Sequence, residues 1–457
     1  MRLSIDTVRE CNKVAEAALC YTGDILDPRR DKYDLKYYVD MAKELAAAGA
    51  NIIAIKDMAG LLKPEASYRL VSALKDAVDL PIHLHTHEGS GNAIYTYARA
   101  VDAGVDIVDT AMSAMSCGTS QPSGSSLYYA LSGHPRQPRV DVDAMNELSR
   151  YWETVRPYYK AADQTELFPN PEVYVHEMPG GQYTNLKQQS TSLGLIERWE
   201  EVKDMYHRVS MMFGDLIKVT PSSKIVGDMA LFMVQNDLSE EDIYAKGDVL
   251  DFPASVVEFF EGRIGVPYQG FPQKLQQIVL KGRKPLEGRP GDTLPPVNFE
   301  EIKAKLAELE APITEEAVSS YCLYPKVFTD WVKRVHDFGD VSVLDTPTFF
   351  FGMKIGEEIK VEIEQGKMLV IKLVHIGEAN ADGIRTVSFE FNGLPREIDI
   401  KDRNVKATNI SRKKADKANQ GEIGATLSGS VVKVLVEKGQ AVTLSLIHIS
   451  EPTRLLS

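Results

Sequence analysis

His85 and His87 are the residues whose type and spacing point most directly to chemistry. They lie in residues 80–91, which read as a short strand followed by a Glu-Gly-Ser-Gly turn. Side chains alternate across a strand, so both imidazoles point the same way and Thr86 points the other. Neutral imidazole nitrogens suit Zn, Mn or Fe, and two of them make half of a metal site. A solvated edge with two exposed histidines is the alternative, and the doublet alone leaves it open.

Repeated strand–helix units must position these side chains. Apolar runs at residues 15–23, 50–57, 80–87 and 105–111 alternate with stretches of helical periodicity, at spacings of about 25–35 residues. Lys56 and Asp109 follow two of these runs, and polar groups of parallel α/β folds gather at such strand ends. A closed barrel needs eight units. Residues 1–140 are therefore predicted to form the last four βα units of a TIM barrel, with four more expected upstream.

Three further regions are expected after the barrel portion. Residues 141–343 are helix-rich, with a capping box at Ser239 and with strands or turns at 173–176 and 216–220. From Ile359 the hydrophobic period changes to two, which predicts a small antiparallel β domain over residues 344–402. Its hairpin turns are expected at 365–366, 381–383 and 392–393. Residues 403–419 are polar and basic, as in a solvated linker.

Composition excludes several classes of protein. The net charge of −13 argues against nucleic-acid binding. No apolar run is long enough to cross a membrane, and no signal peptide opens the chain. The cysteines show neither metal spacing nor a paired framework, which fits free thiols in a reducing compartment. They are Cys11, Cys20, Cys117 and Cys322. A reducing compartment predicts a location in the cytoplasm.

Several long motifs occur together in one order. They occupy residues 55–64, the His-Thr-His segment, 119–123, 176–183 and 219–224. In this order the chain resembles the carboxyltransferase domain of the pyruvate carboxylases, and residues 345–352 resemble the segment leading into their tetramerisation domain. Residues 420–443 resemble the start of their biotin carrier domain, without its biotin-acceptor lysine. Residues 444–457 look like a non-native, adapter-derived tail. The resemblance implies a fragment truncated at both ends.

The resemblance also implies a reaction and a role for each matching residue. Carboxybiotin would donate a carboxyl group to pyruvate, giving oxaloacetate for anaplerosis and gluconeogenesis through a metal-stabilised enolate. Lys56, as a carbamate, would bind a divalent metal (Mn²⁺ or Zn²⁺) together with His85 and His87. Thr220 would relay a proton between pyruvate and biotin. Ser223 and Lys224 would help to hold biotin.

The resemblance also implies how the full-length parent assembles, and it implies functional residues that this chain does not contain. A further metal-ligating aspartate and a pyruvate-binding arginine are expected upstream, so the isolated fragment is expected to be inactive. The full-length parent would bind ATP, form a homotetramer and lie in the bacterial cytoplasm, or in the mitochondrial matrix of a eukaryotic source.

Alternative interpretations exist for two of these residues and for the chain. Lys56 could be a lysine paired with Asp57 or with an upstream carboxylate, and Thr220 could be a strand-end hydroxyl that caps a turn. The chain could belong to the carboxyltransferase subunit of an oxaloacetate decarboxylase. It could also act only as a non-catalytic oligomerisation scaffold.

Overall fold

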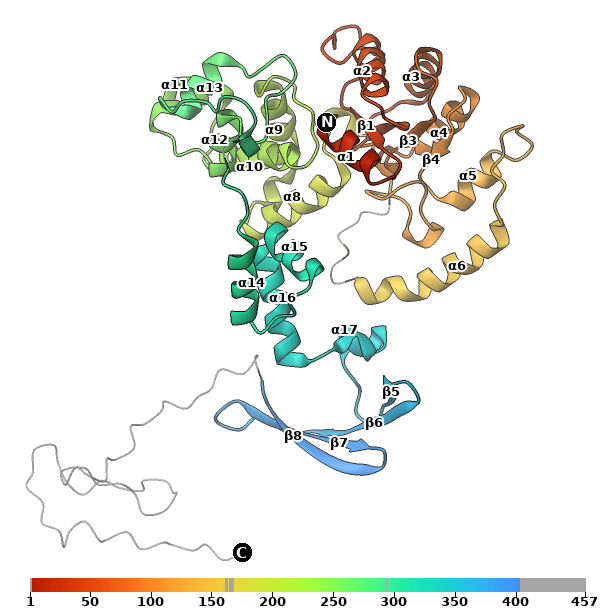
Figure 1. Ribbon diagram of the computed structural model, residues 1–457, viewed down its shortest axis with the longest axis vertical. Helices are drawn as coiled ribbons and strands as arrows, with labels where there is room; N and C mark the ends of the chain where they lie inside the picture. The colour runs from red at the N-terminus through yellow and green to blue at the C-terminus, as the bar shows by residue number, and fades with distance from the viewer. Residues whose placement is uncertain (1, 161–162, 164–167, 293, 403–457) are drawn as a thin grey trace, which may run out of the picture. The chain divides into compact units, whose positions relative to one another are not determined.

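The computed structural model describes residues 2–160, 163, 168–292 and 294–402 (Figure 1). Among these residues the chain divides into two compact units. The first contains the residues up to Val341 together with Asp345–Phe350, and the second contains Ser342–Leu344 and the residues from Phe351 onward. Each unit has its own sheet. None of the described helices is long and apolar enough to cross a membrane.

The first sheet is parallel, with its strands in chain order, as predicted for βα units. Its strands are β1 (Glu16–Tyr21), β2 (Ile52–Asp57), β3 (Ile82–His85) and β4 (Ile107–Val108). The accompanying helices are α1 (Arg2–Glu10), α2 (Leu35–Ala47), α3 (Pro64–Ala77), α4 (Ala93–Asp102) and α5 (Gly124–Ala130). The described strands form an open four-stranded sheet within an α/β fold.

One face of this sheet is sealed by helices, and the other carries polar groups. Ile53, Ile55 and Leu84 are fully buried in the core that α2, α3 and α4 cover (Figure 1). Lys56 pairs in register with His85 on the neighbouring strand, so both side chains project from the opposite face. The alternation therefore separates the packing residues from the residues available for chemistry.

The remainder of the first unit is helical, as expected. Its helices are α6 (Val142–Val155), α7 (Val173–His176), α8 (Gly180–Ser192), α9 (Trp199–Met212), α10 (Ser222–Gln235), α11 (Glu240–Lys246), α12 (Ala254–Glu261), α13 (Gln273–Leu280), α14 (Phe299–Glu308), α15 (Glu315–Leu323) and α16 (Pro325–Phe338), with α17 (Thr346–Phe351) reaching the unit boundary. The capping box at Ser239 is confirmed. Residues 173–176 form a helical turn rather than a strand, and no strand is assigned to residues 216–220.

The second unit contains an antiparallel meander in chain order, as the change of period predicted. Its strands are β5 (Glu358–Glu364), β6 (Lys367–Ile376), β7 (Ile384–Phe391) and β8 (Leu394–Lys401). All three expected hairpin turns fall between these strands. Its proposed part in tetramer formation stays a prediction. The predicted linker (403–419), carrier segment (420–443) and tail (444–457) lie outside the described residues.

Candidate functional site

The two histidines of the doublet face each other across a short gap. His85 is the last residue of β3, and His87 follows it in an extended conformation, with φ −110° and ψ 149°. The strand-like alternation therefore continues past the end of β3. The two Nε2 atoms lie 3.4 Å apart, and the rings are almost perpendicular, at 86°. The imidazoles converge on one point, as the spacing predicted.

The outer nitrogen of each ring is held by an acceptor. His85 Nδ1 lies 2.8 Å from Asp109 Oδ2, and His87 Nδ1 lies 2.6 Å from the carbonyl oxygen of Thr119. A carbonyl only accepts, so the proton of His87 resides on Nδ1, and the carboxylate favours the same tautomer of His85. Two Nε2 lone pairs then face each other, an arrangement that can hold a cation between them. Metal–nitrogen bonds of about 2.1 Å at a tetrahedral angle place two ligand nitrogens about 3.4 Å apart, which fits this gap.

Burial favours the neutral form of His87, which is the form that can bind a metal. Burial lowers the pKa of His87 below its usual value, and the charge of neighbouring His85 acts in the same direction. His83 Nε2 also lies 3.0 Å from Asp109 Oδ1, although it makes no hydrogen bond there. The hydrogen bond to Asp109 fixes the orientation of His85. The sequence places Asp109 at the end of a strand and does not predict this contact.

Lys56 lies on the same face of the sheet as the imidazoles, one strand away from His85. Asp57 points to the other face, where it accepts hydrogen bonds from Thr86 Oγ1 and from the amides of Leu61 and Leu62. Asp57 is therefore not the ion-pair partner of Lys56. Across the described part of the chain, no three His, Cys, Asp or Glu side chains form a group that could hold a metal ion.

Thr220 opens onto a groove of about 720 Å³ between α8 and α10. Its side chain is exposed and precedes a cis peptide bond to Pro221. The adjacent turn is held by Ser222, whose hydroxyl donates to the carbonyls of Ile217 and Val219. Thr220 is thus not the residue that closes the turn, and its hydroxyl is available to a molecule in the groove.

Amide side chains give this groove a polar, uncharged wall. Gln182, Gln188 and Gln189 line it from α8, opposite Thr220 and Lys224. Lys224 forms an ion pair with Asp228, with 2.6 Å between Nζ and Oδ2. Ser223 is only 2 % exposed in the first turn of α10, and it is not among the residues that line the groove. The structure therefore brings Thr220 and Lys224 together and places Ser223 behind them.

The first turn of α8 connects the groove to the histidines. The amide of Gly180 donates to the carbonyl of Met58, just beyond β2, at 3.0 Å. A Cβ added to Gly180 would lie 3.1 Å from His87 Nδ1 and 3.0 Å from the carbonyl oxygen of Thr119, so a larger residue would have to displace one of them slightly. Gln182, two residues later, faces the groove that contains Thr220. The histidines and the groove therefore flank the same helical turn.

His176, in α7 beside this turn, makes the unit sensitive to acid. It is 5 % exposed, and its Nδ1 accepts a hydrogen bond from the amide of Met178 at 3.0 Å. Burial lowers the pKa of His176 to about 4. The unfolded chain, with a histidine pKa of about 6.5, takes up this proton earlier on acidification, so stability falls between about pH 6.5 and pH 4.

Because of His176, we expect the free energy of unfolding to be about 2 kcal/mol lower at pH 5 than at pH 7. His176→Asn keeps an acceptor near the position of Nδ1 and does not titrate there, so it should remove this part of the pH dependence. Urea unfolding of both proteins at the two pH values measures the difference. Identical pH dependence of the two proteins would contradict the prediction.

Comparisons with known proteins identify relatives of the whole described region. A family model described as a conserved carboxylase domain matches residues 173–372, and an HMGL-like model matches residues 6–151. The pyruvate carboxylase of Bacillus subtilis is 58% identical over 443 residues, which are 97% of this chain and 39% of that protein. The enzyme of Staphylococcus aureus is 54% identical over 444 residues, with the same two shares. The chain thus spans well under half of these relatives' length.

A solved structure of a related protein has a similar fold. The carboxyl transferase domain of Rhizobium etli pyruvate carboxylase superposes with a TM-score of 0.85 at 50% identity. The match covers 88% of this chain and 68% of that domain. The same domain has also been solved with pyruvate and biocytin.

Proposed function

The chain belongs to the pyruvate carboxylase family, and we propose that it carries out the step that transfers a carboxyl group from carboxybiotin to pyruvate, giving oxaloacetate. The observation that carries this proposal is the pair of facing Nε2 atoms of His85 and His87, 3.4 Å apart. Both rings keep their protons on the outer nitrogens, so the gap between them suits a divalent cation. Mn²⁺ and Zn²⁺ are the candidates that we propose.

Lys56 would complete the metal ligands that this chain supplies. A lysine amine that has taken up CO₂ becomes an anionic carbamate, which is an oxygen ligand for a divalent metal. The register of β2 and β3 directs Lys56 to the face that carries both imidazoles. A cation bound there would act as a Lewis acid on the keto group of pyruvate, which makes the methyl protons more acidic.

Thr220 would move the proton. Its hydroxyl oxygen accepts a proton from the methyl carbon of pyruvate while its own proton passes to the ureido nitrogen of biotin. The carboxyl group moves from that nitrogen to the methyl carbon, so the hydroxyl ends the step unchanged. Exposure of Thr220 in this groove supports the role, since the relay requires access from both reactants. We propose Lys224 and Ser223 as biotin-binding residues, with Ser223 acting from its buried position through the fold of the turn.

A chimera tests the proposal. In Bacillus subtilis pyruvate carboxylase, the 443 matched residues are replaced by those of this chain, so that the relative supplies every other part. We expect the chimera to form oxaloacetate from pyruvate, ATP and bicarbonate, measured in a coupled assay. The unmodified relative is the positive control. Biotin carboxylation without oxaloacetate formation would contradict the proposal and would favour a non-catalytic scaffold.

A further inference from the structure

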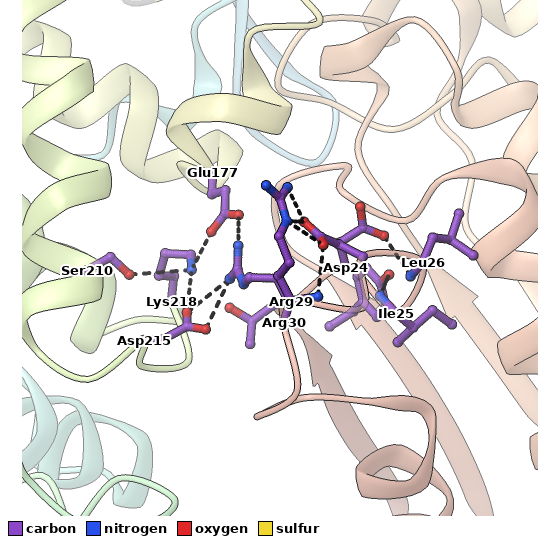
Figure 2. Close-up of polar contacts among 12 residues, drawn as sticks. Asp24, Ile25, Leu26, Arg29, Arg30, Glu177, Ser210, Asp215 and Lys218 are labelled. Atoms are coloured by element: carbon purple, nitrogen blue, oxygen red, sulfur yellow. Dashed lines mark hydrogen bonds and ion pairs between the residues drawn. The ribbon is translucent and has the colours of Figure 1, made fainter.

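Four charged side chains form a neutral, closed cluster where the strands of the first unit meet its helices (Figure 2). Arg30, in the loop between β1 and α2, donates to Glu177 Oε1 at 2.7 Å and to both carboxylate oxygens of Asp215 at 3.1 Å. Lys218 Nζ lies 3.0 Å from Glu177 Oε2 and 3.9 Å from Asp215 Oδ1. Two cations and two carboxylates thus neutralise one another.

The cluster is buried, which makes its geometry specific. The side chain of Lys218 is 1% exposed and that of Glu177 is 7% exposed. Burial by itself would raise the pKa of Glu177, but Lys218 and Arg30 hold it below its usual value, so the carboxylate stays charged. Buried ion pairs add little net stability compared with apolar packing. The planar guanidinium of Arg30, however, fixes the direction of two partners at once.

Each acidic partner of Arg30 leads to a different part of the proposed site. Glu177 has a left-handed backbone, with φ +54°, and precedes the turn in which Gly180 packs against His87. Asp215 is also left-handed, with φ +49°, and opens the segment that ends at Thr220. Such backbone conformations are uncommon for non-glycine residues, and contacts with the surrounding structure help to hold them. Arg30 and Lys218 both pair with these two residues, and Arg30 donates hydrogen bonds to both of them.

We propose that Arg30 is a positioning residue for carboxyl transfer: by holding Glu177 and Asp215 together, it sets the place of Thr220 relative to His87. The inference rests on the proposed function, since the position of Thr220 relative to His87 matters only if both take part in that reaction. A proton relay is sensitive to small displacements, because an error of about 1 Å can lower a rate by about 100-fold. Arg30 therefore acts on the rate of the step rather than on the binding of pyruvate.

Arg30→Lys is the decisive variant, because it keeps the charge and removes the fork that reaches two carboxylates. In the chimera we expect kcat to fall by about 10-fold to 100-fold, with an unchanged KM for pyruvate and unchanged metal content. The matched control is Arg29→Lys, in the same loop. Arg29 is exposed and pairs with Asp27, so this change should leave kcat unaltered.

The other outcomes are distinguishable. A folded Arg30→Lys chimera with normal kcat would overturn the inference, and so would a raised KM at unchanged kcat. If Arg30→Lys lowers Tm by more than about 10 °C, Asp215→Asn replaces it under the same criterion, because it keeps an acceptor for the guanidinium. An unsubstituted chimera without activity would instead contradict the proposed function.

Discussion

Thr220→Ala should lower oxaloacetate formation by the chimera by about 100-fold to 10,000-fold, the usual contribution of a positioned proton-transfer group. A methyl group neither accepts the proton from pyruvate nor donates one to biotin. The substitution removes a side chain that is exposed in the groove, so the surrounding fold should persist. Oxaloacetate formation and ATP-dependent biotin carboxylation are measured on the same preparation, and only the former should fall.

Two matched variants separate the relay from general effects of substitution. Thr220→Ser keeps a hydroxyl at the groove and should retain most of the activity. Thr191→Ala removes an exposed threonine of α8 whose hydroxyl bonds only to the carbonyl of Lys187, so it should have no effect. Near-normal oxaloacetate formation in Thr220→Ala would remove Thr220 from the mechanism.

His85→Asn and His87→Asn should each abolish tight metal binding by the chimera. Asparagine ends before the position of Nε2, so each variant loses a ligand while keeping a donor near Nδ1. We expect the metal affinity to fall by at least about 100-fold, because even outer partners of ligating histidines contribute about 10-fold to 100-fold. Metal content per protomer after dialysis, measured by elemental analysis, reports this loss independently of activity.

A graded variant and a control sharpen the metal experiment. Asp109→Asn removes only the charge that orients His85, so its metal affinity should fall by about 10-fold to 100-fold, less than for the ligand variants. His134→Asn is the control. His134 pairs with Asp102 and is distant in the sequence from the doublet. This substitution should leave the metal content unchanged. Full metal occupancy in His87→Asn would show that the imidazole pair is not the binding site.

The parts of this fold that depend on local pattern could be predicted from the sequence. The period of two in the β unit and the helical periods around β2 and β3 mark their elements clearly, because burial on one face dictates the spacing of apolar residues. The β-branched side chains of residues 173–176 predict a strand or a turn, and the structure shows a helical turn. So short a segment takes its conformation from what surrounds it rather than from its own preference.

Part of the candidate site could also be predicted from the sequence. The histidine doublet follows from alternation along one strand, and Asp109 could have been found from the register of β3 and β4, since His83 pairs with Ile107. The hydrogen bond from His87 to the carbonyl of Thr119 could not be predicted from residue type, because every residue has a backbone carbonyl. Arg30 lies 147 and 185 residues from its two partners, and no local pattern carries a contact of that range.

The two imidazoles are held by different kinds of hydrogen-bond acceptor, a side-chain carboxylate and a backbone carbonyl, and this difference affects how the protein can evolve. His85 is held by a side chain, so a single substitution at Asp109 would change the basicity of His85 and, if His85 binds the proposed metal, the metal preference as well. His87 is held by the main-chain carbonyl of Thr119, which no substitution at that position removes. Of the two proposed ligands, substitution of a partner side chain can therefore adjust His85 and leaves the support of His87 in place. Lineages of this chain should diverge in metal use through Asp109, while the environment of His87 stays the same.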